Sequence, residues 1–168
     1  MNTVNIQYIT INNIDFILGS YEGKLCLLDY KNRTKRDTID KRIQKKLDAQ
    51  YKEQSDSVIK KTVSQLKEYF ENTRQEFDIP LLLVGSEFQK SVWESLLEIP
   101  YGRTSSYKKQ SKSIGNEKAV RAVANANGAN SIAIIVPCHR IIGTNGTLTG
   151  YAGGLDVKQM LLDLEGMV

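Results

Sequence analysis

The sequence contains few of the residues that hold metal ions or build a disulfide scaffold. Among 168 residues there are one histidine, His139, and two cysteines, Cys26 and Cys138. A structural zinc site usually takes four such ligands, and Cys26 has no histidine near it in the sequence. We therefore expect no metal ion and no other cofactor. Two widely spaced cysteines indicate reduced thiols in the cytoplasm rather than a disulfide framework.

Long apolar runs are also missing. No apolar stretch approaches the roughly 18 residues of a membrane span, and the N-terminus lacks the basic segment and apolar core of a secretory signal. The hydrophobic content of 40% and the charged content of 25% are ordinary for a soluble globular protein. The composition and length predict a cytoplasmic protein without membrane contact, made of one domain or two small ones.

Positive charge is concentrated in one stretch of the chain. The formal net charge is +4, which by itself only weakly favours anionic partners. Residues 31–61 carry eleven Lys or Arg against five Asp or Glu. A nucleic-acid-binding segment is one interpretation. A solvated loop and helix face is the favoured one, because the basic residues alternate with acids.

The first half of the chain has the pattern of a small sheet with a helix. Alternating apolar and polar residues, typical of half-buried strands, occur in three segments: 4–11, 15–23 and 24–30. Apolar residues at helical spacing follow between Ser57 and Asn72. Cys26 lies in a strand pattern and is interpreted as a core residue. We expect a first domain over residues 1–79.

The second half, residues 80–168, is expected to be mostly helical. Residues 86–89 form a Ser-x-x-Gln capping box, which predicts a helix beginning there and stopping at Pro100 and Gly102. Two further helices are expected over 105–114 and 117–126, joined by a glycine-containing turn, as in a helix-turn-helix. The predicted fold class is therefore α/β, of the α+β kind.

The last of these helices is rich in alanine and carries one long cation. Its alanines are Ala119, Ala122, Ala124 and Ala126, and the cation is Arg121. A helix that reads the major groove needs several long polar side chains. This helix could instead lie close to a backbone in the minor groove and push one side chain into the base stack. A buried helix selected for close packing explains the same residues equally well.

The segment 134–143 reads I-I-V-P-C-H-R-I-I-G. We interpret the apolar run 132–136 as a buried strand that ends at Pro137, immediately before Cys138. A thiolate is the reactive form of cysteine, and burial alone raises a thiol's pKa unless a base or cation opposes it. Neighbours on a strand point to opposite faces. Contact between Cys138 and His139 therefore requires a bend or a bridging water.

An imidazole that acts as a base usually needs a third group to orient it. The acids that follow the motif are Asp156, Asp163 and Glu165, and the residues alone do not select among them. An inert core thiol remains the alternative interpretation of Cys138.

The tetrad Pro137-Cys138-His139-Arg140 resembles the active site of the O6-alkylguanine-DNA alkyltransferases, also called methylated-DNA–protein-cysteine methyltransferases. The resemblance is specific and extends over residues 80–168. The further motifs, in family order, are Phe88-Gln89-x-x-Val92-Trp93, Ile99-Pro100-Tyr101-Gly102, Ser106-Tyr107, Ala119-Val120-Arg121-Ala122-Val123, Asn127-Gly128-x-Asn130, Gly150-Tyr151-Ala152-Gly153-Gly154-Leu155, Lys158 and Leu161-Leu162-x-Leu164-Glu165-Gly166. The first half fits the variable, ribonuclease H-like N-terminal domain of that family by length and pattern.

The resemblance implies a suicide reaction in DNA repair. Cys138 would take the alkyl group from O6-alkylguanine, and from O4-alkylthymine, irreversibly and once per molecule. His139 would act as a base through a water, and Glu165 would hold the imidazole. Asn130 would tie the helix-turn-helix to the active-site segment, and Tyr107 would hydrogen-bond the flipped base.

The resemblance also implies two binding surfaces on a monomer that binds double-stranded DNA through the minor groove. In the DNA surface, Arg121 would fill the space left by the flipped nucleotide. The other expected DNA-binding residues are Ser106, Ala119, Ala122 and Asn127. The expected base pocket consists of Tyr107, Ala133, Val136, Tyr151, Ala152 and Lys158.

Four positions depart from the family pattern: Ser131, Ser111, and the pocket residues Ala133 and Ala152, which are smaller than the residues that some relatives carry there. Ser131 stands where the family usually has proline, and Ser111 replaces a common alanine.

Other classes of function fit the sequence less well. A cysteine hydrolase would have its histidine far from the cysteine in sequence, and a thiol peroxidase would not explain Arg121. A non-catalytic protein that binds alkylated DNA is the remaining alternative, and the presence of Cys138 favours activity over it.

Overall fold

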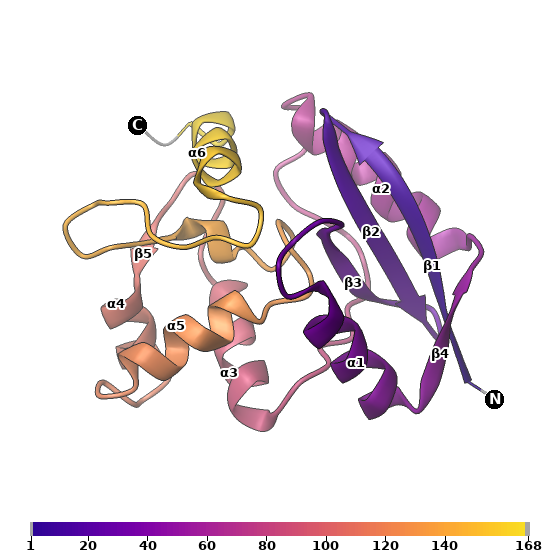
Figure 1. The fold of residues 1–168 in the computed structure, drawn as a ribbon. Coiled ribbons are helices and arrows are strands. Elements are labelled where there is room, and N and C mark those ends of the chain that lie inside the picture. Colours follow the sequence, from indigo (N-terminus) through magenta and orange to yellow (C-terminus); the bar gives the residue numbers. More distant parts are fainter. Residues whose placement is uncertain (1, 167–168) are drawn as a thin grey trace. The chain divides into compact units, whose positions relative to one another are not determined.

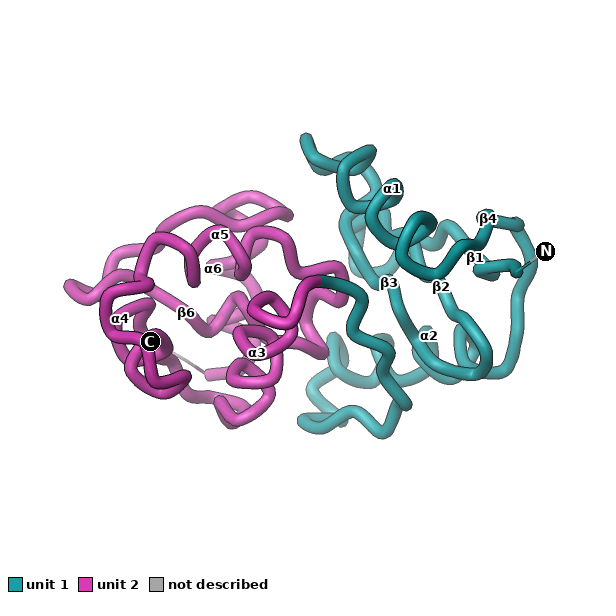
Figure 2. Tube along the Cα trace, turned by 90° about the horizontal axis from the view of Figure 1, so that it is seen from below, with its two compact units in different colours: residues 1–85 teal, residues 86–168 magenta. Residues whose placement is uncertain are grey.

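The structure, a computed structural model, describes residues 2–166 and divides into two compact units. Unit 1 comprises the residues up to Gly85, and unit 2 begins at Ser86 (Figure 2). The expected α+β fold class is confirmed: unit 1 is built around a four-stranded sheet, and unit 2 is mostly helical (Figure 1).

The sheet of unit 1 has the strand order β3-β2-β1-β4. Its strands are β1 (Asn2–Ile11), β2 (Ile14–Tyr21), β3 (Lys24–Tyr30) and β4 (Ala49–Glu53). The first three form an antiparallel meander, whereas β4 pairs with β1 in parallel. Asn12 and Asn13, which join β1 to β2, have φ of 55° and 62°. Both central residues of a type I′ hairpin turn need such positive φ angles, which asparagine tolerates well.

Two helices, α1 (Arg36–Leu47) and α2 (Ser57–Phe70), cover opposite faces of this sheet. Successive strand residues point to opposite faces. Ile17 belongs to the apolar cluster that contains Ile39 and Ile43 of α1. Phe16, its neighbour on β2, contacts Phe70 of α2, with 6.5 Å between ring centroids. The strand patterns and the helical spacing of residues 57–72 are therefore confirmed.

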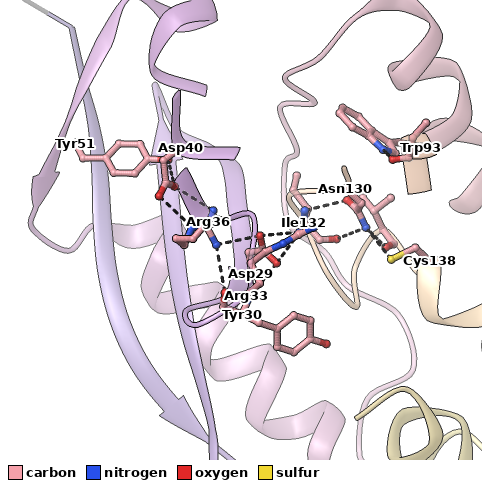
Figure 3. Close-up of polar contacts among 12 residues, drawn as sticks. Asp29, Tyr30, Arg33, Arg36, Asp40, Tyr51, Trp93, Asn130, Ile132 and Cys138 are labelled. Carbon is pink, nitrogen blue, oxygen red and sulfur yellow. Dashed lines mark hydrogen bonds and ion pairs between the residues drawn. The ribbon is translucent and has the colours of Figure 1, made fainter. Parts of the chain in front are cut away.

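The basic stretch 31–61 contains elements that its sequence pattern did not reveal, namely α1 and β4. Some of its cations are not solvated. Arg33 and Arg36 contact the fully buried carboxylate of Asp29 at 3.1 and 3.0 Å, and Arg36 also pairs with Asp40 (Figure 3). Part of the positive charge therefore neutralises acids inside unit 1.

The segment after residue 79 belongs to unit 1 in the structure, whereas the sequence placed it in the second domain. The amide of Leu25 donates to the carbonyl of Pro80, and the amide of Leu82 donates to the carbonyl of Leu25, both at 2.8 Å. These bonds attach residues 80–82 to β3, so the compact units divide after Gly85. Pro80 follows the last apolar pattern of the first half, but the chain continues to pack on unit 1 as far as Gly85.

Unit 2 positions its site on short elements joined by turns. These are α3 (Glu87–Leu96), β5 (Ser105–Ser106), α4 (Tyr107–Ser113), α5 (Val120–Gly128), the 3-10 turn η1 (Cys138–Arg140), β6 (Ile141–Ile142) and α6 (Leu155–Leu164). The predicted capping box between Ser86 and Gln89 is present. The helix ends at Leu96, several residues before the expected stop at Pro100. Helices α4 and α5 form the expected helix-turn-helix and start two to three residues later than predicted.

The expected buried strand over residues 132–136 is wrong. The segment is a tight turn: the amide of Ile135 donates to the carbonyl of Ala133 at 2.7 Å, and that of Val136 to Ile132 at 3.0 Å. Ile134 adopts a positive φ of 70°, which is unusual for a β-branched residue. Four of the five residues are buried, and an apolar run that is buried all round has no periodicity to separate strand from turn.

Candidate active site

The side-chain amide of Asn130 organises the turn that carries Cys138 (Figure 3). Its Nδ2 donates to the carbonyl of Val136 at 2.8 Å and approaches Cys138 Sγ at 3.4 Å. Its Oδ1 accepts from the amide of Ile132 at 2.9 Å. Asn130 lies two residues after α5. It therefore connects the helix-turn-helix to the thiol, and its N–H directed at sulfur can stabilise a thiolate.

Cys138 and His139 differ in exposure although they are adjacent. Cys138 is half-buried at the start of the 3-10 turn η1, whereas the side chain of His139 is 0% exposed. The amide of Cys138 donates to the carbonyl of Val136 at 2.8 Å. Because the backbone bends here, the two side chains do not follow the alternation of a strand.

His139 is part of a buried charge network with Glu165 and Arg140. His139 Nε2 lies 2.7 Å from Glu165 Oε2. Arg140 donates from Nε to Glu165 Oε1 at 2.8 Å and from Nη2 to Oε2 at 3.1 Å, so the pair is bidentate. Two parallel guanidinium N–H bonds hold a carboxylate in a fixed orientation. Of the three acids considered from sequence, Glu165 is buried and bonded, whereas Asp156 and Asp163 are exposed.

The protonation of His139 follows from its burial. Desolvation lowers the pKa of this imidazole, against the opposing hydrogen bond and charge of Glu165. Arg140 and Lys158 lower it further. A neutral imidazole with Nε2–H donated to a carboxylate keeps an unprotonated Nδ1. Among residues 2–166, this buried Nδ1 has no hydrogen-bond partner, which leaves it available as a base.

Lys158 and Tyr107 meet at the loop between β6 and α6. Lys158 is 0% exposed, and its Nζ donates to the carbonyl of Thr149 at 2.8 Å. Desolvation lowers the pKa of Lys158, and negative charge on Cys138 opposes that shift. Thr149 Oγ1 donates to the hydroxyl of Tyr107, the first residue of α4, at 2.9 Å. Thr149 thus links two expected pocket residues, Lys158 and Tyr107.

The other expected pocket residues lie in two separate segments of unit 2. Ala133 and Val136 are buried in the turn before η1. Tyr151 and Ala152 are half-buried in the loop that precedes α6. In the sequence, these two segments flank the part of the chain that contains Cys138 and Thr149.

The residues expected to bind DNA divide into exposed and buried ones. Arg121 and Ala122 are exposed on α5, and Ala119 is half-buried at its start. Ser106 is buried and caps α4 by accepting from the amide of Lys109 at 3.1 Å. Asn127 is buried too, so its amide faces the interior of unit 2 rather than a ligand.

Asn127 forms a reciprocal amide pair with Gln110 across the helix-turn-helix. Gln110 Nε2 donates to Asn127 Oδ1 at 2.9 Å, and Asn127 Nδ2 donates to Gln110 Oε1 at 2.7 Å. Gln110 Nε2 also lies 3.3 Å from Ser95 Oγ on α3. Buried amides that satisfy each other in this way fix the register of the helices that carry them.

Comparisons with known proteins cover both units. Residues 15–83 match the model described as "6-O-methylguanine DNA methyltransferase, ribonuclease-like domain", and residues 87–167 match the DNA binding domain of the same family. A solved Mycobacterium tuberculosis O6-methylguanine methyltransferase is 39% identical with a TM-score of 0.81, covering 96% of this chain and 92% of that one. This chain belongs to the 6-O-methylguanine DNA methyltransferase family.

Other relatives in this methyltransferase family agree with that assignment. A Mycobacterium tuberculosis OGT structure in complex with DNA is 38% identical with a TM-score of 0.80, covering 97% of this chain and 92% of that one. A methylated-DNA–protein-cysteine methyltransferase of Methanosarcina acetivorans is 61% identical over 102 residues. That alignment covers 61% of this chain and 65% of the relative, less than two thirds of its length.

Some residues at the candidate site had no assigned role in the sequence analysis. Arg140 stands in the quoted tetrad, but only the structure shows its bidentate bond to Glu165. Gln110 and Thr149 carry no sequence signal, because their partners Asn127 and Tyr107 are 17 and 42 residues away. Exposed lysines on and beside α4 could have been found from the basic run in its sequence; they are Lys108, Lys109, Lys112 and Lys118.

Within residues 2–166, no group of three or more His, Cys, Asp or Glu side chains could hold a metal ion. No helix in that range has the length and apolarity to cross a membrane.

Proposed function

We propose that this protein removes the alkyl group from O6-alkylguanine in DNA and transfers it to Sγ of Cys138. The observation that carries the proposal is a half-buried thiol that is followed, in the same 3-10 turn, by a buried histidine whose Nδ1 has no partner in the described chain. The thiol receives an amide N–H from Asn130, and the histidine is oriented by Glu165. The names of the relatives support the same activity.

The reaction is a displacement at carbon with His139 as the base. The proton of the thiol passes to the imidazole through a water, and the sulfur attacks the alkyl carbon. The C–S bond forms as the C–O bond breaks, and the electron pair of that bond goes to the guanine. The guanine then takes up one proton, which balances the proton lost by the thiol of Cys138. A thioether is a poor leaving group, so each molecule reacts once.

The alkyl carbon lies inside the DNA duplex, so the base has to be extruded before it can react. Extrusion costs a few kcal/mol, and a side chain inserted into the stack offsets part of that cost. Arg121 is the exposed long side chain on α5. The neighbouring alanines are small, so this helix can approach the DNA backbone closely. We assign α5 to the minor groove and Arg121 to the vacated position in the stack.

Exposed cations of the helix-turn-helix supply the contacts to phosphate. Lys108, Lys109 and Lys112 of α4 are exposed, as is Lys118 before α5. Binding through such contacts weakens steeply with salt and does not depend on sequence. This suits a repair protein that meets damage in any sequence, acting in the cytoplasm as a monomer.

The proposed base pocket is formed by α4, the turn before η1 and the loop before α6. Tyr107 would hydrogen-bond the extruded base, while Tyr151 and the backbone around Val136 and Ala152 would line its faces. Ala133 and Ala152 have small side chains. We infer that the pocket accepts groups larger than methyl and also O4-alkylthymine.

A mass measurement tests the proposed function. The protein is incubated with a duplex that carries a single O6-methylguanine, and the intact mass and the modified peptide are determined. We expect one added methyl group per chain, located on Cys138, with the DNA restored to guanine. Tight binding to the damaged duplex without any mass increase would instead indicate a non-catalytic damage-binding protein. Repeated turnover would contradict the suicide reaction.

A further inference from the structure

The loop between β6 and α6 is attached to the rest of unit 2 by Thr149. The backbone carbonyl of Thr149 accepts from Lys158 Nζ at 2.8 Å, and its hydroxyl donates to Tyr107 Oη at 2.9 Å. One residue therefore connects α6 to the first residue of α4. The neighbouring residues Thr147 and Asn145 bond only within the loop and are exposed.

Lys158 makes this connection a rigid one. Its side chain is fully buried, and the Thr149 carbonyl is the hydrogen-bond partner of its ammonium within residues 2–166. A buried ammonium that lost this acceptor would be left unsatisfied, which costs several times more than an ordinary hydrogen bond. The backbone position of Thr149 is therefore strongly determined, and its hydroxyl is presented to Tyr107 at a fixed place.

The second bond joins two hydroxyls, either of which can donate. When an extruded base accepts the proton of the phenol, the oxygen of Tyr107 is left to accept from Thr149. No other side-chain bond of this hydroxyl occurs in the described chain. A hydroxyl that accepts one hydrogen bond becomes a better donor in the next, because hydrogen bonds in a chain polarise one another.

We propose that Thr149 is a positioning residue for alkyl transfer, which holds the hydroxyl of Tyr107 so that the phenol donates to the extruded base. The inference rests on the proposed function. As the C–O bond breaks, electron density moves onto the base, and a donor directed at the base stabilises that change. Thr149 itself does not touch the reacting atoms, and it acts through Tyr107.

The test compares three variants by single-turnover transfer rates. Thr149→Val removes the hydroxyl and keeps the shape of the side chain. We expect it to slow transfer about 3- to 10-fold, the effect of one neutral hydrogen bond. Thr149→Ser keeps the hydroxyl and should restore most of the rate. Thr147→Val is the matched control on the same loop, and it should react like the wild type.

A double-mutant cycle with Tyr107→Phe separates positioning from general support of the loop. If Thr149 acts through the phenol, Thr149→Val should have almost no further effect when Tyr107 is already Phe. Full additivity of the two changes would overturn the inference. An unchanged or faster Thr149→Val would also overturn it, because then the threonine would not help the phenol to donate. Thermal unfolding of each variant checks that the loop change leaves the fold intact.

The substrates are a duplex that carries one O6-methylguanine and free O6-benzylguanine. Because the phenol would touch the base itself, both substrates should show the same dependence on Thr149. The wild-type chain is measured alongside. If it acquired no alkyl group from either substrate, the proposed function would fail. If it reacted and Thr149→Val matched it, only the role of Thr149 would fail.

Discussion

The two cysteines of the chain show what makes a thiol reactive in this fold. Cys26 lies in β3 with 0% exposure, and its Sγ contacts the carbonyl of Gly19 at 3.6 Å. Desolvation raises the pKa of this thiol to about 12. Cys138 is half-buried, lies at the head of a 3-10 turn, and receives an amide N–H from Asn130. The first environment stabilises the protonated thiol, and the second supports the thiolate.

The buried carboxylates of the two units differ in a similar way. Asp29 in unit 1 is held by two guanidinium groups, those of Arg33 and Arg36. Glu165 in unit 2 is held by one guanidinium and one imidazole, and that imidazole keeps an unpartnered Nδ1 within the described chain. The network in unit 1 consists of permanently charged cations, whereas that in unit 2 contains a group able to take up a proton. Only the carboxylate network of unit 2 therefore contains a group that could act as a base.

The largest expected effect separates the two thiols directly. Cys138→Ala should abolish alkyl uptake, because the other thiol, Cys26, is fully buried and its pKa is raised to about 12. Cys26→Ala should keep the wild-type transfer rate and lower stability, since it leaves a small void in the core of unit 1. Intact mass after incubation with methylated duplex, together with urea unfolding, measures both. Methylation found on Cys26 in folded protein would contradict the comparison.

The second prediction removes the base. His139→Ala should slow transfer by about 100- to 10,000-fold, the usual contribution of a general base, and leave the affinity for undamaged DNA nearly unchanged. Because burial lowers the pKa of His139, the wild-type rate should stay level as the pH falls to about 6.5 and decline only below it. Single-turnover rates between about pH 5.5 and 8 provide the measurement.

The control for this prediction keeps a polar group at the same position. His139→Gln can still donate to Glu165 but cannot act as a base at neutral pH. It should therefore fold like the wild type and react as slowly as His139→Ala. Transfer at the wild-type rate in either variant would show that the thiol of Cys138 ionises without the imidazole.

Much of the fold could be predicted because its signals are local. The meander of unit 1 has a two-residue period, and the capping box of Ser86 and Gln89 needs only four residues. Helix α1 and strand β4 were missed because their polar surfaces hide the apolar positions Ile39 and Ile43 among many charges. The run 132–136 was assigned wrongly because its residues are apolar and mostly buried in a turn, which leaves no period to read.

The candidate site could be predicted in part for the same reason. Cys138 and His139 are adjacent, so the sequence alone indicated a candidate nucleophile beside a candidate base. The choice of Glu165 among three acids came from the family resemblance, and the contact depends on a pairing across 26 residues. The pairs of Arg140 with Glu165 and of Thr149 with Tyr107 also join distant segments. No local pattern encodes such contacts, because only the packing of α6 and the loops creates them.

The third prediction concerns a residue outside the thiol environment. Arg121→Ala should slow transfer from duplex DNA by about tenfold or more, since 1.4 kcal/mol of lost support for extrusion corresponds to a factor of ten. Reaction with free O6-benzylguanine needs no extrusion and should be nearly unchanged. Single-turnover rates on both substrates provide the comparison.

The matched control for Arg121 is an exposed cation on the preceding helix. Lys112→Ala should weaken binding to all duplexes alike and lower the salt slope by about one, as expected for a phosphate contact. Equal slowing of Arg121→Ala on duplex and free base would reject its place in the stack and return α5 to a packing role.

The smallest expected effect is a pH dependence of stability that belongs to unit 2 alone. His139 is the only histidine in the chain, and desolvation lowers its pKa in the folded state. The unfolded chain therefore binds a proton near pH 6.5 that the folded chain takes up only at lower pH. The free energy of unfolding should fall as the pH falls below about 6.5, by at most about 1.4 kcal/mol per pH unit. Burial raises the pKa of Asp29 in unit 1, so protonation there removes no stability in this window. Hydrogen exchange should accordingly show lost protection around η1 and α6 but not around β3 and Cys26, and His139→Gln should flatten the dependence. A wild-type stability that increased on acidification would mean that Glu165 outweighs desolvation, and the imidazole would then be a charged partner of Glu165 rather than a base for Cys138.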